Sequence, residues 1–190
     1  MSNEPIELVD RSGPSRLALI SALAVGAITV VLIFVLATSE GETGLGPSPL
    51  IGAMTPEVTG ATVDGTEYDI QSQRGRWVVV NFFSTTCVPC IVEHPELVAF
   101  DEAHTPVGDA SVVSIAFSDQ SQNVIDFFAE FGGEWPVLAA DTGRHAINFG
   151  VAAVPETYLV SPTGIVTTKF IGGVTQADLE AEIRRLSGGQ

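Results

Sequence analysis

The stretch from Trp77 to Leu97 constrains the fold of this chain most, because an apolar run there leads directly into two cysteines and a helical pattern. Residues 78–83 (VVVNFF) are almost continuously apolar, which is typical of a strand buried on both faces of an α/β sheet. Apolar side chains then recur at helical spacing, at Ile91, Val92, Leu97, Val98 and Phe100. We therefore expect Cys87 just ahead of a helix and Cys90 in its first turn.

This placement predicts a reactive dithiol. The first turn of a helix offers unpaired N–H groups and the positive end of the helix dipole, which both favour a thiolate. Cys87 is therefore the expected nucleophile, and Cys90 is placed to attack a mixed disulfide on Cys87 and release the reduced partner. No Lys or Arg occurs between Arg76 and Arg144, so any lowering of the Cys87 pKa must come mainly from the helix terminus and local hydrogen bonds.

Two other interpretations of the cysteine pair stay open at the level of sequence. A zinc site needs four ligands, and the further candidates are His94, His104 and His145, with no second cysteine pair. A purely structural disulfide is the other alternative, although two intervening residues close only a small, readily reduced ring. We favour the redox interpretation, which needs no cofactor beyond the cysteines themselves.

Length and charge set further limits. A chain of 190 residues is long enough for one domain with an adequate core behind an N-terminal segment. Its 23 acidic and 8 basic residues give a net charge of −15, which argues against a nucleic-acid partner.

The N-terminal part predicts a membrane anchor. Residues 1–16 are a polar tail, and residues 17–39 carry no charge and are long enough to span a bilayer. A cleaved signal peptide is the competing interpretation, but its apolar core is shorter. Arg11 and Arg16 precede the run, so we expect a cytoplasmic tail (1–16), an anchor (17–38), a linker (39–50) and an extracytoplasmic domain (51–190).

The rest of the chain predicts alternating strands and helices. A turn at Asp64-Gly65 indicates a small hairpin within 63–70. Strands are expected at 77–83, 110–117, 135–139, 157–160 and 165–171, and helices after Cys87 and at 124–131, 142–149 and 174–186. This order indicates an α/β domain with a mixed sheet covered on both faces.

Four segments together resemble a known family: VVVNFF (78–83), CVPC (87–90), EHPEL (93–97) and GVAAVPETYLVSPTGIV (150–166). The family is the membrane-anchored thioredoxin-like thiol-disulfide oxidoreductases of bacteria, including those of cytochrome c maturation, and the resemblance covers residues 51–186. It implies a thioredoxin-like fold and a redox-active Cys87–Cys90 pair. It also implies protein thiol or disulfide substrates such as apocytochrome c, and a membrane thiol oxidoreductase as electron donor. A general extracytoplasmic reductase or oxidase and a metal-binding chaperone are the alternatives.

The resemblance assigns roles to three further residues. Pro155 would be a cis-proline facing the dithiol, which leaves the Val154 backbone free to pair with a substrate; the alternative is a trans-proline at the start of an edge strand. Glu93 and Glu156 would be proton acceptors for thiol exchange; the alternatives are a helix-dipole charge and a solvent-facing strand residue.

Two positions depart from what relatives would carry. The usual buried Asp of thioredoxins looks replaced by Asn81. Most members of the family have Trp where this chain has Thr86, so the surface beside the nucleophile should be smaller and more polar here.

Overall fold

The computed structural model describes residues 16–38, 44–140 and 142–188. The chain forms two compact units, Met1–Glu40 and Gly41–Gln190. The described part of the first unit is a helix, α1 (Arg16–Thr38). Among the described residues, no helix meets the requirements of length and hydropathy for crossing a membrane. The anchor predicted for residues 17–38 thus stays a prediction, and the tail predicted before it lies, apart from Arg16, outside the described residues.

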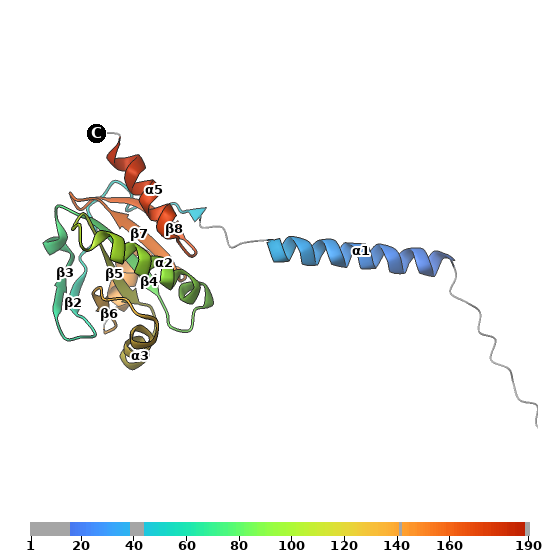
Figure 1. Ribbon diagram of the computed structural model, residues 1–190, viewed down its shortest axis with the longest axis horizontal. Helices are drawn as coiled ribbons and strands as arrows, with labels where there is room; N and C mark the ends of the chain where they lie inside the picture. Colours follow the sequence, from blue (N-terminus) through green and yellow to red (C-terminus); the bar gives the residue numbers. More distant parts are fainter. Residues whose placement is uncertain (1–15, 39–43, 141, 189–190) are drawn as a thin grey trace, which may run out of the picture. The chain divides into compact units, whose positions relative to one another are not determined.

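The second unit is built on a mixed sheet, which Figure 1 shows with helices packed around it. In its described residues the sheet has the strand order β1-β8-β7-β4-β5-β6. These strands are β1 (Gly44–Leu45), β4 (Trp77–Phe83), β5 (Ala110–Ala116), β6 (Val137–Leu138), β7 (Glu156–Val160) and β8 (Val166–Ile171). Strands β4, β5 and β6 are parallel, whereas β7 runs antiparallel to both β4 and β8. The predicted mixed α/β sheet is therefore confirmed.

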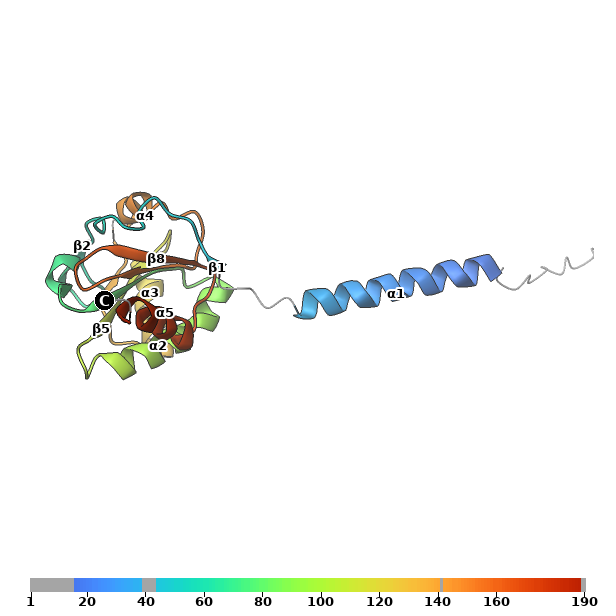
Figure 2. The same cartoon turned by 90° about the horizontal axis from the view of Figure 1, so that it is seen from above.

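Helices and smaller elements cover the two faces of this sheet. They are α2 (Val88–His104), α3 (Ser121–Phe131), α4 (Gly143–Phe149), α5 (Gln176–Ser187), the 3-10 helix η1 (Ile70–Gln73) and the hairpin of β2 (Thr59–Ala61) and β3 (Glu67–Asp69). Figure 2 shows α4 on one side of the sheet and α2 and α5 on the other. Helices end where the sequence predicts, for example α3 at Gly132 and α4 at left-handed Gly150.

Strand β4 separates two cores. Val79 and Phe83 point into the first core with side chains of α2, α3 and α5, and Val80 and Phe82 point into the second core with α4 and the hairpin. Each of these four side chains is at most 3% exposed, and burying one contributes roughly 1.5–3 kcal/mol. Because both faces of β4 are covered, its sequence is a nearly continuous apolar run and does not alternate between apolar and polar residues.

The folded unit starts before the boundary expected at residue 51. Strand β1 pairs antiparallel with β8, matching Gly44 with Ile171 and Leu45 with Phe170. Gly46 continues this contact, because its N–H donates to the Lys169 carbonyl at 2.8 Å. The chain is thus bound to the sheet within the residues 39–50 for which we expected a linker.

The second core also contains a buried ion pair that sequence reasoning missed. Lys169 Nζ lies 2.9 Å from Glu156 Oε2, and the two side chains are 8% and 3% exposed. Burial alone would lower the pKa of Lys169, but hydrogen bonds to Glu156 and Tyr158 outweigh it and raise that pKa. The Tyr158 hydroxyl also donates to the Phe149 carbonyl at 2.8 Å, so the pair is part of a satisfied polar cluster.

Lys169→Met should strongly destabilise the domain, because it leaves the Glu156 carboxylate buried without its cation. Breaking a buried pair from one side costs about 3–5 kcal/mol. Chemical denaturation at pH 7 measures this loss. Arg184→Met is the control, since Arg184 forms an exposed pair with Glu180 and should cost no more than about 1 kcal/mol. Equal effects of the two substitutions would contradict a stabilising role for the buried pair.

Candidate functional site

Cys87 and Cys90 form a disulfide at the N-terminus of α2. Cys87 is the N-cap residue, and its Sγ accepts a hydrogen bond from the Cys90 backbone N–H at 3.3 Å. Cys90 is 2% exposed, whereas Cys87 is only partly buried. The predicted positions before and inside the first helical turn are confirmed, and the geometry leaves Cys87 as the sulfur that a partner can reach.

The turn that delivers Cys87 is held by Asp119, which sequence reasoning missed. Asp119 Oδ2 accepts hydrogen bonds from the Thr85 N–H and hydroxyl, both at 2.7 Å, and from the Ser84 hydroxyl at 3.1 Å. Burial would raise the pKa of Asp119, but the hydrogen bonds from Thr85, Gln120 and Asn123 lower it. The carboxylate therefore stays charged and fixes Ser84 and Thr85, and the Ser84 hydroxyl in turn contacts that of Thr86 at 3.2 Å.

The backbone beside Asp119 is strained to make this contact. Ser118 has a φ of 52°, in the left-handed region that favours glycine, and it carries a side chain there. Backbone strain of this kind is found where surrounding contacts impose it, often at functional sites. The one signal in the sequence was the Asp-x-x-x-Asn pattern after a strand, which is not specific.

Pro155 lies next to the disulfide. The Val154–Pro155 peptide bond is cis, as the family resemblance implies. The Val154 carbonyl oxygen lies 3.5 Å from Cys87 Sγ. On its other side, the Pro155 carbonyl accepts a hydrogen bond from the Gly172 N–H at 3.1 Å, which joins the loop before β7 to the loop after β8. Two loops thus flank the sulfur pair.

Glu93 is a buried residue of the dithiol helix α2, three residues after Cys90. It is 3% exposed, and its carboxylate accepts hydrogen bonds from Asn81 Nδ2 at 2.7 Å and from the Val174 N–H at 3.0 Å. Burial raises the pKa of Glu93 to about 7, even though both hydrogen bonds act to lower it. A carboxyl group that titrates near neutral pH can take up and return a proton under working conditions.

The structure separates Glu156 from Glu93. Glu156 shares its sheet face with Tyr158 in the second core, whereas Glu93 bonds to Asn81, on the first-core face. Glu156 is also paired with Lys169, and its Oε1 accepts a hydrogen bond from the Ala152 N–H at 3.3 Å. Glu156 therefore anchors the loop that carries Pro155, and the structure does not bring it to the face on which the dithiol helix packs.

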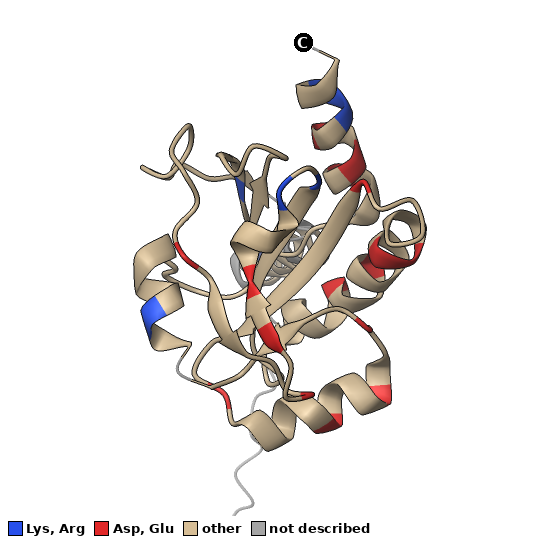
Figure 3. Cartoon of the chain, turned by 90° about the vertical axis from the view of Figure 1, so that its left-hand side faces the viewer, with Lys and Arg blue, Asp and Glu red and all other residues tan. Residues whose placement is uncertain are grey.

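The three chain segments that flank the disulfide carry no charged side chains of their own. Residues 84–92, 150–155 and 171–174 contain no Asp, Glu, Lys or Arg, although the chain has 31 such residues counting 8 basic and 23 acidic. Val88 and Val92 project from α2 with 70% and 71% of their surface exposed. Figure 3 marks the charged residues along the chain, among which the acidic ones predominate. A partner that reaches Cys87 therefore meets the exposed valines and, directly before Cys87, the exposed polar Thr86.

The three histidines lie in separate contacts. His94 Nε2 bonds to the Gly132 carbonyl, His104 Nδ1 to Asp109, and His145 to the carbonyls of Glu57 and Thr59. Within the described ranges, no group of three or more His, Cys, Asp or Glu side chains could hold a metal ion. The histidine ligands that a zinc site would need are not brought to the cysteines.

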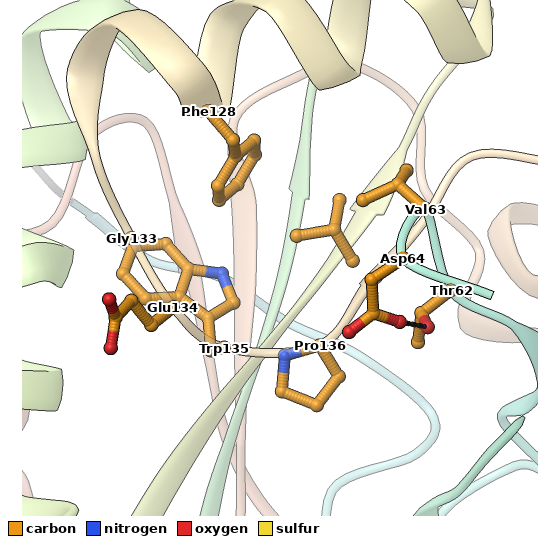
Figure 4. Close-up of a pocket in the computed structure, with 9 residues that line it drawn as sticks. Thr62, Val63, Asp64, Phe128, Gly133, Glu134, Trp135 and Pro136 are labelled. Atoms are coloured by element: carbon orange, nitrogen blue, oxygen red, sulfur yellow. Dashed lines mark hydrogen bonds between the residues drawn. The ribbon is translucent and has the colours of Figure 1, made fainter. Parts of the chain in front are cut away.

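A hollow of about 150 Å³ opens between α3 and the β2–β3 hairpin. Figure 4 shows Trp135 and Phe128 on one side of it and Val63 and Asp64 on the other. Its lining includes neither cysteine and none of the other predicted site residues.

Known proteins with a similar sequence or structure fit this site. The model of the Redoxin family matches residues 51–183. The chain is 29% identical over 158 residues to the thiol:disulfide interchange protein HelX of Rhodobacter capsulatus, a match covering 80% of this chain and 86% of the relative. It is 33% identical over 135 residues to the thiol:disulfide interchange protein DsbE homolog of Paracoccus denitrificans, covering 70% and 72%.

A solved structure confirms the thioredoxin-like fold. The thiol:disulfide interchange protein of the thioredoxin family from Chlorobium tepidum superposes with a TM-score of 0.65 at 26% identity. The superposition covers 74% of this chain and 98% of that protein. With the Cys87–Cys90 disulfide at the N-terminus of α2 and the family model matched over most of the folded unit, the chain belongs to the Redoxin family and is a thiol-disulfide oxidoreductase.

Proposed function

We propose that this protein reduces disulfides in extracytoplasmic proteins, and that its substrate is apocytochrome c during cytochrome c maturation. The observation that carries the redox part is the Cys87–Cys90 disulfide beside the Val154 carbonyl. The substrate is supported by the EHP and VPET segments, which resemble the cytochrome-maturation branch, and by the similarity to HelX and to the DsbE homolog.

The reaction proceeds in two exchanges. The Cys87 thiolate attacks one sulfur of the substrate disulfide, forms a mixed disulfide and releases the other substrate sulfur, which is protonated. Cys90 then loses its proton and attacks Cys87 Sγ, which releases the second substrate thiol and leaves the Cys87–Cys90 disulfide. A membrane thiol oxidoreductase must supply two electrons and two protons to restore the dithiol. The absence of Lys and Arg around Cys87 supports a reductant, because strong oxidants depend on extreme thiolate stabilisation.

Glu93 is the proton acceptor for Cys90 in this proposal. Residues three apart on a helix share a face, and Glu93 is buried beside the first turn that carries Cys90. Within the described part of the chain, the hydrogen-bond partners of its carboxylate include no cation, so it can exchange a proton without breaking an ion pair. Glu156 has such a cation in Lys169 and serves to hold the Pro155 loop.

Cys90→Ser should accumulate a mixed disulfide with substrate on Cys87, because the resolving thiol is lost. Cys87→Ser should accumulate none, since Cys90 is almost fully buried. Non-reducing electrophoresis followed by mass spectrometry of the cross-linked peptides measures both. Equal trapping by the two variants would show that the assignment of roles is incorrect.

Glu93→Gln should remove the inflection near pH 7 from the pH profile of thiol exchange and slow the second exchange by about 100-fold. Below pH 7 wild-type Glu93 is protonated and cannot accept a proton, so the wild-type rate should rise through this range. Stopped-flow measurements between pH 5 and 9 follow the rate. Glu96→Gln is the control, because Glu96 lies on the same helix but bonds to the Gln176 N–H. An unchanged profile in Glu93→Gln would exclude this role.

The proposal includes a membrane anchor at residues 17–38, with the domain outside the cytoplasm. It is supported by the uncharged run at 17–39 and by Arg11 and Arg16 before it. The full chain should stay with membranes after an alkaline wash, and Val30→Arg should weaken this retention while Val30→Leu should not. A reporter fused after Gln190 should be active only if it works outside the cytoplasm. Reporter activity in the cytoplasm would reverse the orientation.

The substrate is tested by deleting the gene and measuring covalent haem on c-type cytochromes, with and without a small thiol reductant. We expect loss of haem attachment that the reductant restores, since the defect would be unreduced haem-attachment cysteines. Normal attachment would leave a general extracytoplasmic reductase or oxidase as the function. Failure of the reductant to rescue the defect would argue against a reducing role.

A further inference from the structure

A chain of buried hydrogen bonds leads from Trp135 to Glu93. Trp135 Nε1–H donates to Ser114 Oγ at 2.8 Å, the Ser114 hydroxyl to Asn81 Oδ1 at 3.4 Å, and Asn81 Nδ2 to Glu93 Oε1 at 2.7 Å. The four residues are 6%, 1%, 1% and 3% exposed. They come from the segment before β6, from β5, from β4 and from α2, so the chain crosses the first core from the hollow of Figure 4 to the dithiol helix.

The bonds of this network run in one direction. An indole N–H can only donate, so the Ser114 oxygen accepts from Trp135. The Ser114 hydroxyl in turn donates to the carbonyl oxygen of the Asn81 amide. Its NH₂ group therefore faces the opposite way, toward Glu93 and toward Thr157 Oγ1, which lies 3.1 Å away.

The direction of these hydrogen bonds determines which protonation state of Glu93 is favoured. Oε1 meets the NH₂ group of Asn81, and Oε2 meets the Val174 N–H, so both oxygens face donors. Donors stabilise a carboxylate, and protonating either oxygen of Glu93 would weaken the hydrogen bond that this oxygen accepts. If Asn81 rotated its amide by half a turn, it would instead present an oxygen that stabilises the protonated form.

We propose that Trp135 and Ser114 are positioning residues that hold the Asn81 amide with its NH₂ group toward Glu93, and so keep Glu93 ionised and able to accept the Cys90 proton. The inference rests on the proposed role of Glu93 in thiol exchange. It assigns a function to an indole and a hydroxyl that touch neither the cysteines nor the carboxylate.

Among the groups around Glu93, the Asn81 amide is the main one whose orientation can change the protonation state of the carboxyl group. On its own helix, His94 bonds to the Gly132 carbonyl and Glu96 to the Gln176 N–H. The strands contribute the neutral Asn81 and Thr157, and the loop after β8 contributes the backbone of Gly173 and Val174. Cys90 lies three residues before Glu93. No charged side chain is bonded to Glu93 among the residues that the structure describes.

Ser114→Ala and Trp135→Phe test the proposal in the oxidised full-length protein. Carbon-13 NMR of the Glu93 carboxyl, assigned with Glu93→Gln, follows its titration without requiring turnover. Each substitution should shift the titration upward by about 0.5 to 1 pH unit, because the donor from Asn81 is no longer held in place. Ser111→Ala on the same strand and Trp77→Phe are matched controls outside the chain, and neither should move the titration.

The double variant provides a second criterion. In a linear chain the loss of Ser114 already disconnects Trp135, so Ser114→Ala/Trp135→Phe should shift the titration no further than Ser114→Ala alone. An additive shift, or no shift in Ser114→Ala, would overturn the proposal. Denaturation curves check that the variants fold, and Ser114→Ala decides the question if the larger Trp135 change unfolds the domain.

The same titration separates this inference from the proposed function. If Glu93→Gln leaves the pH profile of thiol exchange unchanged, Glu93 is not the proton acceptor, whatever the NMR titration shows. If Glu93→Gln changes the profile but Ser114→Ala and Trp135→Phe move neither the profile nor the titration, the proton acceptor stands and the positioning role is excluded.

Discussion

Covering both faces of strand β4 is the constraint on which the domain depends. Its apolar side chains require a layer on each side, and the chain supplies α2, α3 and α5 on one side and α4 with the hairpin on the other. The carboxyl end of the covered strand then leads into the turn before Cys87. Asn81 is the one polar residue within β4, and burying its amide is tolerable because Ser114, Thr157 and Glu93 satisfy it.

The two buried glutamates, Glu93 and Glu156, lie on opposite sides of the sheet and therefore have different partners. Side chains of a strand alternate between its faces, so Glu156 enters the second core even though it follows Pro155 directly. There Lys169 neutralises it. Glu93 meets only uncharged donors in the first core, and burial brings its pKa to about 7. A position directly after Pro155 in the sequence therefore does not place Glu156 on the sheet face that the dithiol helix covers.

Local patterns predicted the strand at 77–83, the cysteines at the start of a helix and the mixed sheet, because burial and helix termini leave periodic signals in sequence. The contacts between distant segments left no such signal. Lys169 is 13 residues from Glu156, Asp119 is 34 from Thr85, and Trp135 is 21 from Ser114. Their pairing depends on strand register and loop geometry, which a single sequence does not contain. Strand β1 was missed because its two residues, Gly44 and Leu45, lie in a segment rich in Gly, Pro and Ser that carries no apolar run.

The segments that flank the disulfide carry no charged side chains, which has a consequence for small thiols. With a net charge of −15 on the chain, the electric field around the protein repels anions over roughly 10 Å at moderate ionic strength. A small thiol that carries several carboxylates is repelled by this field. It also gains little binding free energy beside Cys87, because the exposed side chains of Val88 and Val92 are apolar. An unfolded polypeptide can bury its own apolar side chains against the same two valines, which favours its binding. The net charge therefore disfavours the approach of anionic small thiols, whereas the exposed valines beside Cys87 favour a polypeptide that can bury apolar side chains there.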